Sequence, residues 1–93
     1  LIGGSADTVA TVKTFAQSFY NAIPATTTKT LAVIEGADHL FPQTDNATQP
    51  PNEPTSYTQI SWFKRFADQN TDYNEFLRGK DSAWSSFTTN GSF

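Results

Sequence analysis

Cysteine is absent from this chain of 93 residues. Its absence excludes disulfide bonds, thiolate nucleophiles and thiolate metal sites together, although a count of zero does not fix the cellular compartment. No apolar run reaches the length of about 18 residues that a transmembrane helix requires. The first residues, LIGGSADT, also lack the basic and apolar segments of a signal peptide. We therefore expect neither a membrane span nor a signal peptide in these residues.

Positive charge is scarce as well, with 6 lysine and arginine residues against 9 acidic residues and a formal net charge of -3. The basic residues are scattered along the chain and form no stripe. Because nucleic-acid binding depends on clustered lysine and arginine, we do not expect a nucleic-acid partner. The hydrophobic content of 37% and aromatic content of 14% suffice for the core of one small domain.

Short apolar segments alternate with helical patterns along the chain. Leu1 to Gly4 is typical of the end of a buried strand, and Thr30 to Glu35 is typical of a strand covered on both faces. Apolar residues from Thr11 onward follow the spacing of one helical face, and Pro24 predicts the end of that helix. A second helix is expected from Pro54 to Ala67, with a wide apolar face that should be deeply packed.

The remaining segments are polar or irregular. The sequence from Gln43 to Pro54 contains three prolines and predicts a long surface loop. Tyr73 to Leu77 fits a short helix, and the tail from Arg78 onward is left without an assignment. Two N-x-[ST] sequons, at Asn46 and Asn90, carry little weight because the chain is rich in Asn, Thr and Ser.

The alternation of strand and helix predicts an α/β fold with a mostly parallel sheet. In such sheets, ligands bind outside the carboxyl ends of the strands. Asp7 follows the first predicted strand and His39, the only histidine, follows the second. We therefore expect both side chains at the same edge of the sheet.

An Asp followed by a His on later strand-end loops matches the order of the last two members of an α/β-hydrolase triad. The imidazole takes the proton of a serine hydroxyl, and the carboxylate holds the imidazole in the required tautomer. Periodicity alone favours a simpler role for Asp7, as a turn residue that accepts backbone N–H groups. Asp38 is a rival partner for His39, but adjacent side chains on an extended segment diverge.

The nucleophile is not expected in this chain. Gly3-Gly4-Ser5-Ala6-Asp7 is a near match to G-x-S-x-G, but it lies on the wrong strand, so we interpret Ser5 as a loop residue. No metal site is expected, because one His with Asp38 and Asp45 nearby matches no known ligand spacing. Nothing in the spacing of the acids suggests a glycosidase carboxylate pair.

Four segments carry a stronger signal together: GGSADTVATV, FYNAIP, GADHLFP and SWFKRFADQNTDYNEFL. They match the ordered patterns D-T-[IV]-A-x-V, F-Y-N-x-[IL]-P, G-[AG]-x-H-x-x-P and W-[LFM]-K-R-F-x-D-x-[DN]-T-x-Y. In this order they resemble the C-terminal part of the bacterial cutinase and polyester hydrolase family of α/β-hydrolases, which includes enzymes acting on poly(ethylene terephthalate). The resemblance covers about residues 1 to 77, and several ordered blocks make it specific.

The resemblance implies a secreted serine esterase without a cofactor, in which Asp7 is the triad acid and His39 the triad base. By position, Val9 and Leu40 match residues that line the substrate cleft, and both are apolar here. Three departures stand out. Asp38 replaces the usual Thr or Ser, the loop Gln43 to Thr55 looks longer and richer in proline, and Arg78 replaces a cysteine of the C-terminal disulfide.

We interpret residues 1–93 as the C-terminal segment of a single α/β-hydrolase domain, with the last parallel strands and flanking helices, incomplete as a domain. Its expected partners are an ester or polyester substrate and the N-terminal part of the same domain, which would supply the serine. Two alternatives stay open. One is a non-catalytic structural or self-associating protein derived from this fold, and the other is a binding module for an apolar ligand or polymer surface.

Overall fold

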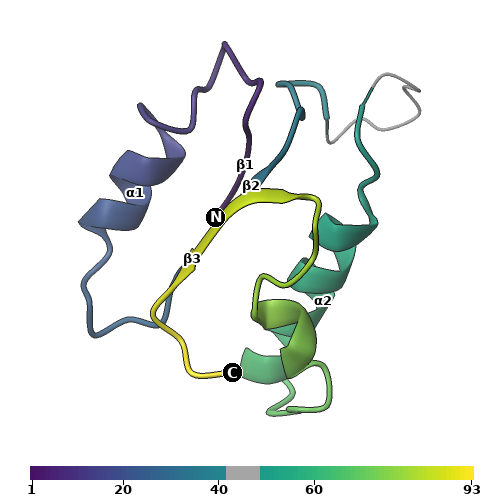
Figure 1. Ribbon diagram of the computed structural model, residues 1–93. Coiled ribbons are helices and arrows are strands. Elements are labelled where there is room, and N and C mark those ends of the chain that lie inside the picture. Colours follow the sequence, from purple (N-terminus) through teal and green to yellow (C-terminus); the bar gives the residue numbers. More distant parts are fainter. Residues whose placement is uncertain (42–48) are drawn as a thin grey trace.

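The computed structural model describes residues 1–41 and 49–93. Its elements follow in the order β1 (Ile2–Gly4), α1 (Ala16–Ala22), β2 (Thr30–Ile34), α2 (Glu53–Phe66), a 3-10 helix η1 (Asn74–Leu77) and β3 (Trp84–Thr89). The strands form one sheet in the order β1-β2-β3. The two α-helices lie on opposite faces of this sheet, so the fold is layered (Figure 1).

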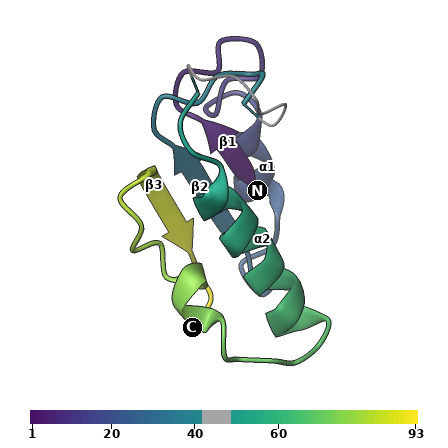
Figure 2. The ribbon, with the colours of Figure 1, turned by 90° about the vertical axis from the view of Figure 1, so that its right-hand side faces the viewer.

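The sheet is mixed, which corrects the expectation of mostly parallel strands. β1 runs parallel to β2, with Ile2 opposite Ala32, whereas β3 runs antiparallel to β2 (Figure 2). The tail left unassigned by the sequence forms β3, and its pairing with β2 shifts register between Val33 and Ile34. Val33 pairs with Ser86 and Ile34 with Trp84, so Ser85 is an extra residue in β3. Ser85 and Ser86 are therefore both exposed in succession, which breaks the alternation that identifies a strand in a sequence.

The central strand carries the core. All five residues of β2 are buried, as predicted for a strand covered on both faces. Ile34, Ala37 and Phe41 form a buried cluster against which Ile2 and Trp84 pack. Leu77 of η1 is also fully buried. The core therefore lies along β2 and continues directly into the loop that follows it.

The helix before β2 begins later than predicted. Turns occupy residues 12–15, and α1 starts only at Ala16, because Gln17 N–H bonds to Val12 O, one residue beyond regular helical spacing. The predicted end before Pro24 is confirmed, since α1 finishes at Ala22 and Ile23 is extended. No residue of α1 is buried.

The predicted deep packing of the second helix is wrong, although its bounds lie within one residue of the prediction. α2 buries Pro54, Thr58 and Ser61 and leaves its large apolar side chains exposed except for the half-buried Trp62, with Phe63 at 69%. Part of the buried face of α2 packs on η1, where Thr58 Oγ1 donates to Phe76 O at 3.2 Å. The first half of the predicted surface loop, residues 43–48, lies outside the described residues, and its last two residues, Glu53 and Pro54, begin α2.

The end of β3 is fastened to the start of β2. Asn90 Oδ1 accepts from Lys29 N–H at 2.8 Å, and Asn90 Nδ2 donates to the carbonyl oxygens of Ala25 and Thr27, each at 3.0 Å. In the same region, Thr30 and Thr89 join their hydroxyl groups at 2.8 Å. These contacts hold β3 in register on β2, and β2 carries the loop with His39.

Candidate active site

Asp7 stands on the loop that leaves β1. Its Oδ1 accepts hydrogen bonds from Val9 N–H at 2.9 Å and Ala10 N–H at 2.8 Å. The carboxylate therefore closes a tight turn in its own loop, as short side chains with an acceptor oxygen do. This arrangement fixes the direction of the second oxygen, Oδ2.

His39 stands on the loop that leaves β2 and meets Asp7. The distance between His39 Nδ1 and Asp7 Oδ2 is 3.0 Å, across 32 residues of sequence. The pairing arises because β1 and β2 are adjacent and parallel, so their carboxyl ends emerge at the same edge of the sheet. The His39 side chain is 47% exposed, whereas that of Asp7 is 11% exposed.

The surroundings of Asp7 favour its charged form. Loss of solvent raises the pKa of Asp7, but hydrogen bonds from Ala10, His39 and Val9, together with the charge of His39, outweigh it and lower the pKa below 3.8. The carboxylate is thus an acceptor near neutral pH. An acceptor at Nδ1 favours the tautomer with a proton on that nitrogen and leaves Nε2 with a lone pair.

The two rival residues are occupied elsewhere. Asp38 Oδ1 accepts from Leu40 N–H at 2.7 Å, and Asp38 N–H donates to Gln49 Oε1 at 3.1 Å, so Asp38 shapes the histidine loop itself. Ser5 Oγ accepts from Gly36 N–H at 2.7 Å. Asp45, the other acid considered for a metal, lies outside the described residues.

Val9 and Leu40, the two predicted cleft residues, stand on the same two loops as the pair. Val9 is 67% exposed and Leu40 is 54% exposed. Each donates its backbone N–H to an aspartate of its own loop, Val9 to Asp7 and Leu40 to Asp38. Contact with a substrate stays a prediction for both residues.

A hollow of about 420 Å³ opens beside Asp7 and His39. Its lining includes the glycines of β1, Phe41 and a polar wall of Asn52, which precedes α2, and Thr55, Ser56 and Gln59 of α2. Sequence reasoning missed this polar wall. No local pattern could have found it, because the wall depends on how α2 packs across the sheet.

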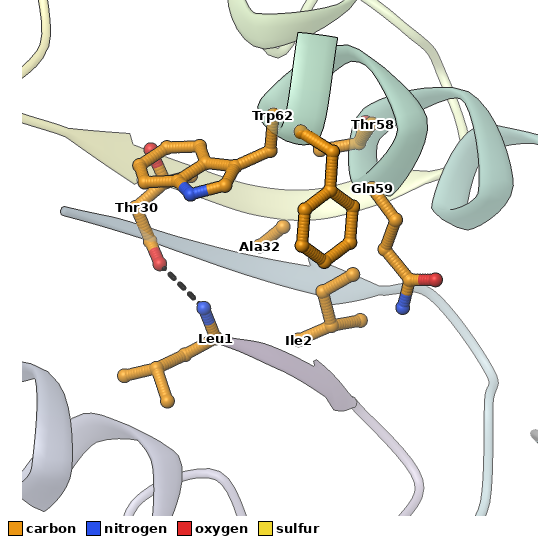
Figure 3. A pocket seen from close by; sticks show the side chains of 8 residues that line it. Leu1, Ile2, Thr30, Ala32, Thr58, Gln59 and Trp62 are labelled. Atoms are coloured by element: carbon orange, nitrogen blue, oxygen red, sulfur yellow. Dashed lines mark hydrogen bonds between the residues drawn. The ribbon is translucent and has the colours of Figure 1, made fainter. Parts of the chain in front are cut away.

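A second hollow, of about 560 Å³, adjoins the first, because Ile2 and Gln59 line both. Figure 3 shows Ile2 of β1 pointing toward α2, which contributes Thr58, Gln59 and Trp62, while the amino group of the preceding residue, Leu1, donates to Thr30 O at 2.9 Å. Its lining is mostly apolar. It contains no titratable side chain that could take part in acid or base chemistry.

Among residues 1–41 and 49–93, no group of three or more histidine, aspartate or glutamate side chains could hold a metal ion. In the same part of the chain, no helix has the length and apolar character needed to cross a bilayer.

Known proteins similar to this chain are ester hydrolases. A family model described as PET hydrolase-like matches residues 1–91. Cutinase 1 of Thermobifida cellulosilytica and a cutinase of Thermobifida fusca are each 36% identical over 77 residues, which is 83% of this chain. A bis(hydroxyethyl) terephthalate hydrolase of Streptomyces coelicolor is 35% identical over the same length.

The chain spans about a quarter of the length of these relatives, with 27%, 24% and 23% covered. The family implies an α/β-hydrolase fold, and a three-stranded mixed sheet with two helices is consistent with part of that fold. The match includes both loops that carry Asp7 and His39. This chain belongs to the PET hydrolase-like family of ester hydrolases.

Proposed function

We propose that this chain supplies the acid and the base of a Ser-His-Asp triad in a carboxylic ester hydrolase. The observation that carries the proposal is the 3.0 Å contact between Asp7 Oδ2 and His39 Nδ1 on adjacent strand-end loops. The order of the two residues in the sequence is that of α/β-hydrolases. Membership of an ester hydrolase family supports the same assignment.

In the proposed reaction, a serine hydroxyl attacks the ester carbonyl while His39 Nε2 takes its proton. The tetrahedral intermediate then expels the alcohol, which leaves with that proton, and an acyl-serine ester remains. Water attacks the acyl group with His39 again acting as base, so the acid is released and the serine recovers its proton. Asp7 holds the ring and stabilises the imidazolium that forms in each half.

The serine belongs, in this proposal, to the N-terminal part of the same domain. The free edge of β1 and the apolar hollow of Figure 3 are the places where that part would pack, because β1 pairs only with β2 within the described residues. Exposed Phe15 just before α1, Phe19 on α1 and Phe63 on α2 support this packing. Side chains of this size are normally buried in the mature domain.

The proposed substrate is an ester with an apolar acyl or aromatic part, such as cutin or a polyester. Exposed Val9 and Leu40 beside the pair would form its contact surface. The relatives named as cutinases and as a bis(hydroxyethyl) terephthalate hydrolase are in line with this substrate class. A secreted location is proposed on the same family resemblance.

The deciding experiment measures p-nitrophenyl ester turnover by the whole protein that contains these residues. We expect Asp7→Asn and His39→Ala each to lower kcat by about 10³-fold or more, as loss of a triad member does in serine hydrolases. Asp68→Asn, which removes an exposed carboxylate paired with Lys64 away from the hollow, serves as the matched control. Full turnover in His39→Ala would contradict the proposal.

An apolar binding module is the second candidate, favoured by the exposed aromatic side chains of α2. Adsorption to a polyester film distinguishes the two functions. A binding module would adsorb without releasing product, and His39→Ala would leave both properties unchanged.

A further inference from the structure

The contact between Asp7 and His39 requires two loops to keep a fixed position relative to each other. Two backbone bonds join them: Ser5 N–H donates to Ile34 O at 2.9 Å, and Ala6 N–H donates to Ala37 O at 3.0 Å. Where these two loops meet, Gly4 is buried, and a Cβ built on it would lie 2.1 Å from Ala37 O. The two backbones are therefore in direct contact just before the paired residues.

The Ser5 side chain adds a third hydrogen bond between the two loops. Its Oγ accepts from Gly36 N–H at 2.7 Å, the shortest of the three bonds. Gly36 has a φ of 74° and turns the chain out of β2 toward His39. Ser5 lies two residues before Asp7, and Gly36 lies three residues before His39, so the bond links the starting points of both loops.

We propose that Ser5 is a positioning residue, whose hydroxyl sets the distance and direction between Asp7 and His39. The inference rests on the proposed hydrolase function and deepens it. Ser5 acts through the pair, because its Oγ is bonded to the backbone at the turn out of β2. Small misplacements matter at such sites, where an error of about 1 Å is able to cost about 10²-fold in rate.

The first test compares variants of the whole protein that contains these residues. We expect Ser5→Ala to lower kcat for a p-nitrophenyl ester by about tenfold with KM changed less than about twofold, because only geometry is altered. Ser5→Thr keeps the hydroxyl and should stay within about twofold of the natural enzyme. Ser18→Ala is the control, since it removes an exposed serine hydroxyl bonded to Lys13 O on the α1 segment.

The second test monitors the contact between Asp7 and His39 directly and does not depend on ester turnover. A proton on His39 Nδ1 that is bonded to a carboxylate gives a low-field proton NMR signal, assigned by its loss in His39→Ala. We expect Ser5→Ala to broaden this signal or move it to higher field, while Ser5→Thr and Ser18→Ala leave it in place. Asp7 and Asp38 are the other titratable groups that line the hollow with His39, so all spectra are recorded at one neutral pH.

The outcomes separate the two proposals. If the whole protein cleaves esters but Ser5→Ala changes neither kcat nor the proton signal, the positioning role is wrong and the hydrolase proposal stands. An equal loss in Ser5→Ala and Ser5→Thr also overturns the role, because the hydroxyl is then irrelevant. If no ester is cleaved at all, the hydrolase proposal fails, and the NMR signal alone decides whether Ser5 holds the pair.

Discussion

The carboxylate of Asp7 makes both kinds of contact that two competing interpretations of the sequence assigned to it, one within its own turn and one with histidine. One oxygen closes the turn over Val9 and Ala10, and the other faces His39. Local pattern predicted a turn, and family resemblance predicted a partner for histidine. The structure shows that the two interactions are compatible, because the turn is what aims the second oxygen.

Asp7 should make the free energy of unfolding depend on pH in the acidic range. Because its pKa is lowered from 3.8 in the folded state, its contribution is fully present above that pH and is lost as the pH falls through the folded value. We expect the difference in unfolding free energy between the natural protein and Asp7→Asn to be constant near neutral pH and to shrink below pH 3.8. Denaturant titrations at several pH values measure it, and a difference that persists unchanged in strong acid would contradict it.

Two glycines near the pair should respond differently to the same added methyl group. Gly4→Ala drives a Cβ against Ala37 backbone atoms, so we expect a loss of about 3 kcal/mol together with reduced turnover. Gly36→Ala meets open space but keeps a φ of 74°, and should cost only about 1–2 kcal/mol. Thermal and denaturant unfolding of both variants compares a steric cost with a conformational one. Equal losses would show that close backbone contact at Gly4 is unimportant.

At the scale of elements, the sequence predicted what depends on short-range pattern. The five buried residues of β2 and the bounds of α2 follow from an apolar run and a helical period. The irregularity of β3 depends on one register shift, and the late start of α1 accompanies one backbone bond of wider spacing, neither of which a sequence period reveals. The polar wall of the hollow could not be predicted from the sequence for another reason, because the tertiary fold decides which residues of α2 line the hollow.

The contacts of Asn90 should be worth more than those of an ordinary surface amide. Asn90→Ala removes three hydrogen bonds that tie β3 to the chain entering β2, so we expect a loss of about 1–2 kcal/mol in unfolding free energy. Asn21→Ala, which removes one exposed bond to Gln17, should change stability by less than about 0.5 kcal/mol. Urea titration of both variants checks the difference, and equal effects would argue against a fastening role.

At the scale of the whole molecule, the exposure of apolar side chains on α2 should differ between the 93 residues alone and the longer protein proposed above. In these 93 residues alone, Phe63→Gln should change unfolding free energy by less than about 0.5 kcal/mol, because the ring is exposed. It should also reduce binding of an apolar fluorescent dye. In the whole protein the same change should cost about 3 kcal/mol or more if the ring is buried there. Equal small effects in both would contradict packing of the N-terminal part on α2.

Asn90 has one more property, which concerns how the protein is produced. It is the acceptor residue of the sequon Asn90-Gly91-Ser92, and a eukaryotic secretory pathway attaches glycans to such residues. A glycan would occupy Nδ2, the atom that donates to Ala25 O and Thr27 O in the folded chain. Secretion from yeast therefore tests whether the sequon is used: any fraction glycosylated at Asn90 should have β3 loosened at its end, whereas bacterial production gives the unglycosylated chain for comparison.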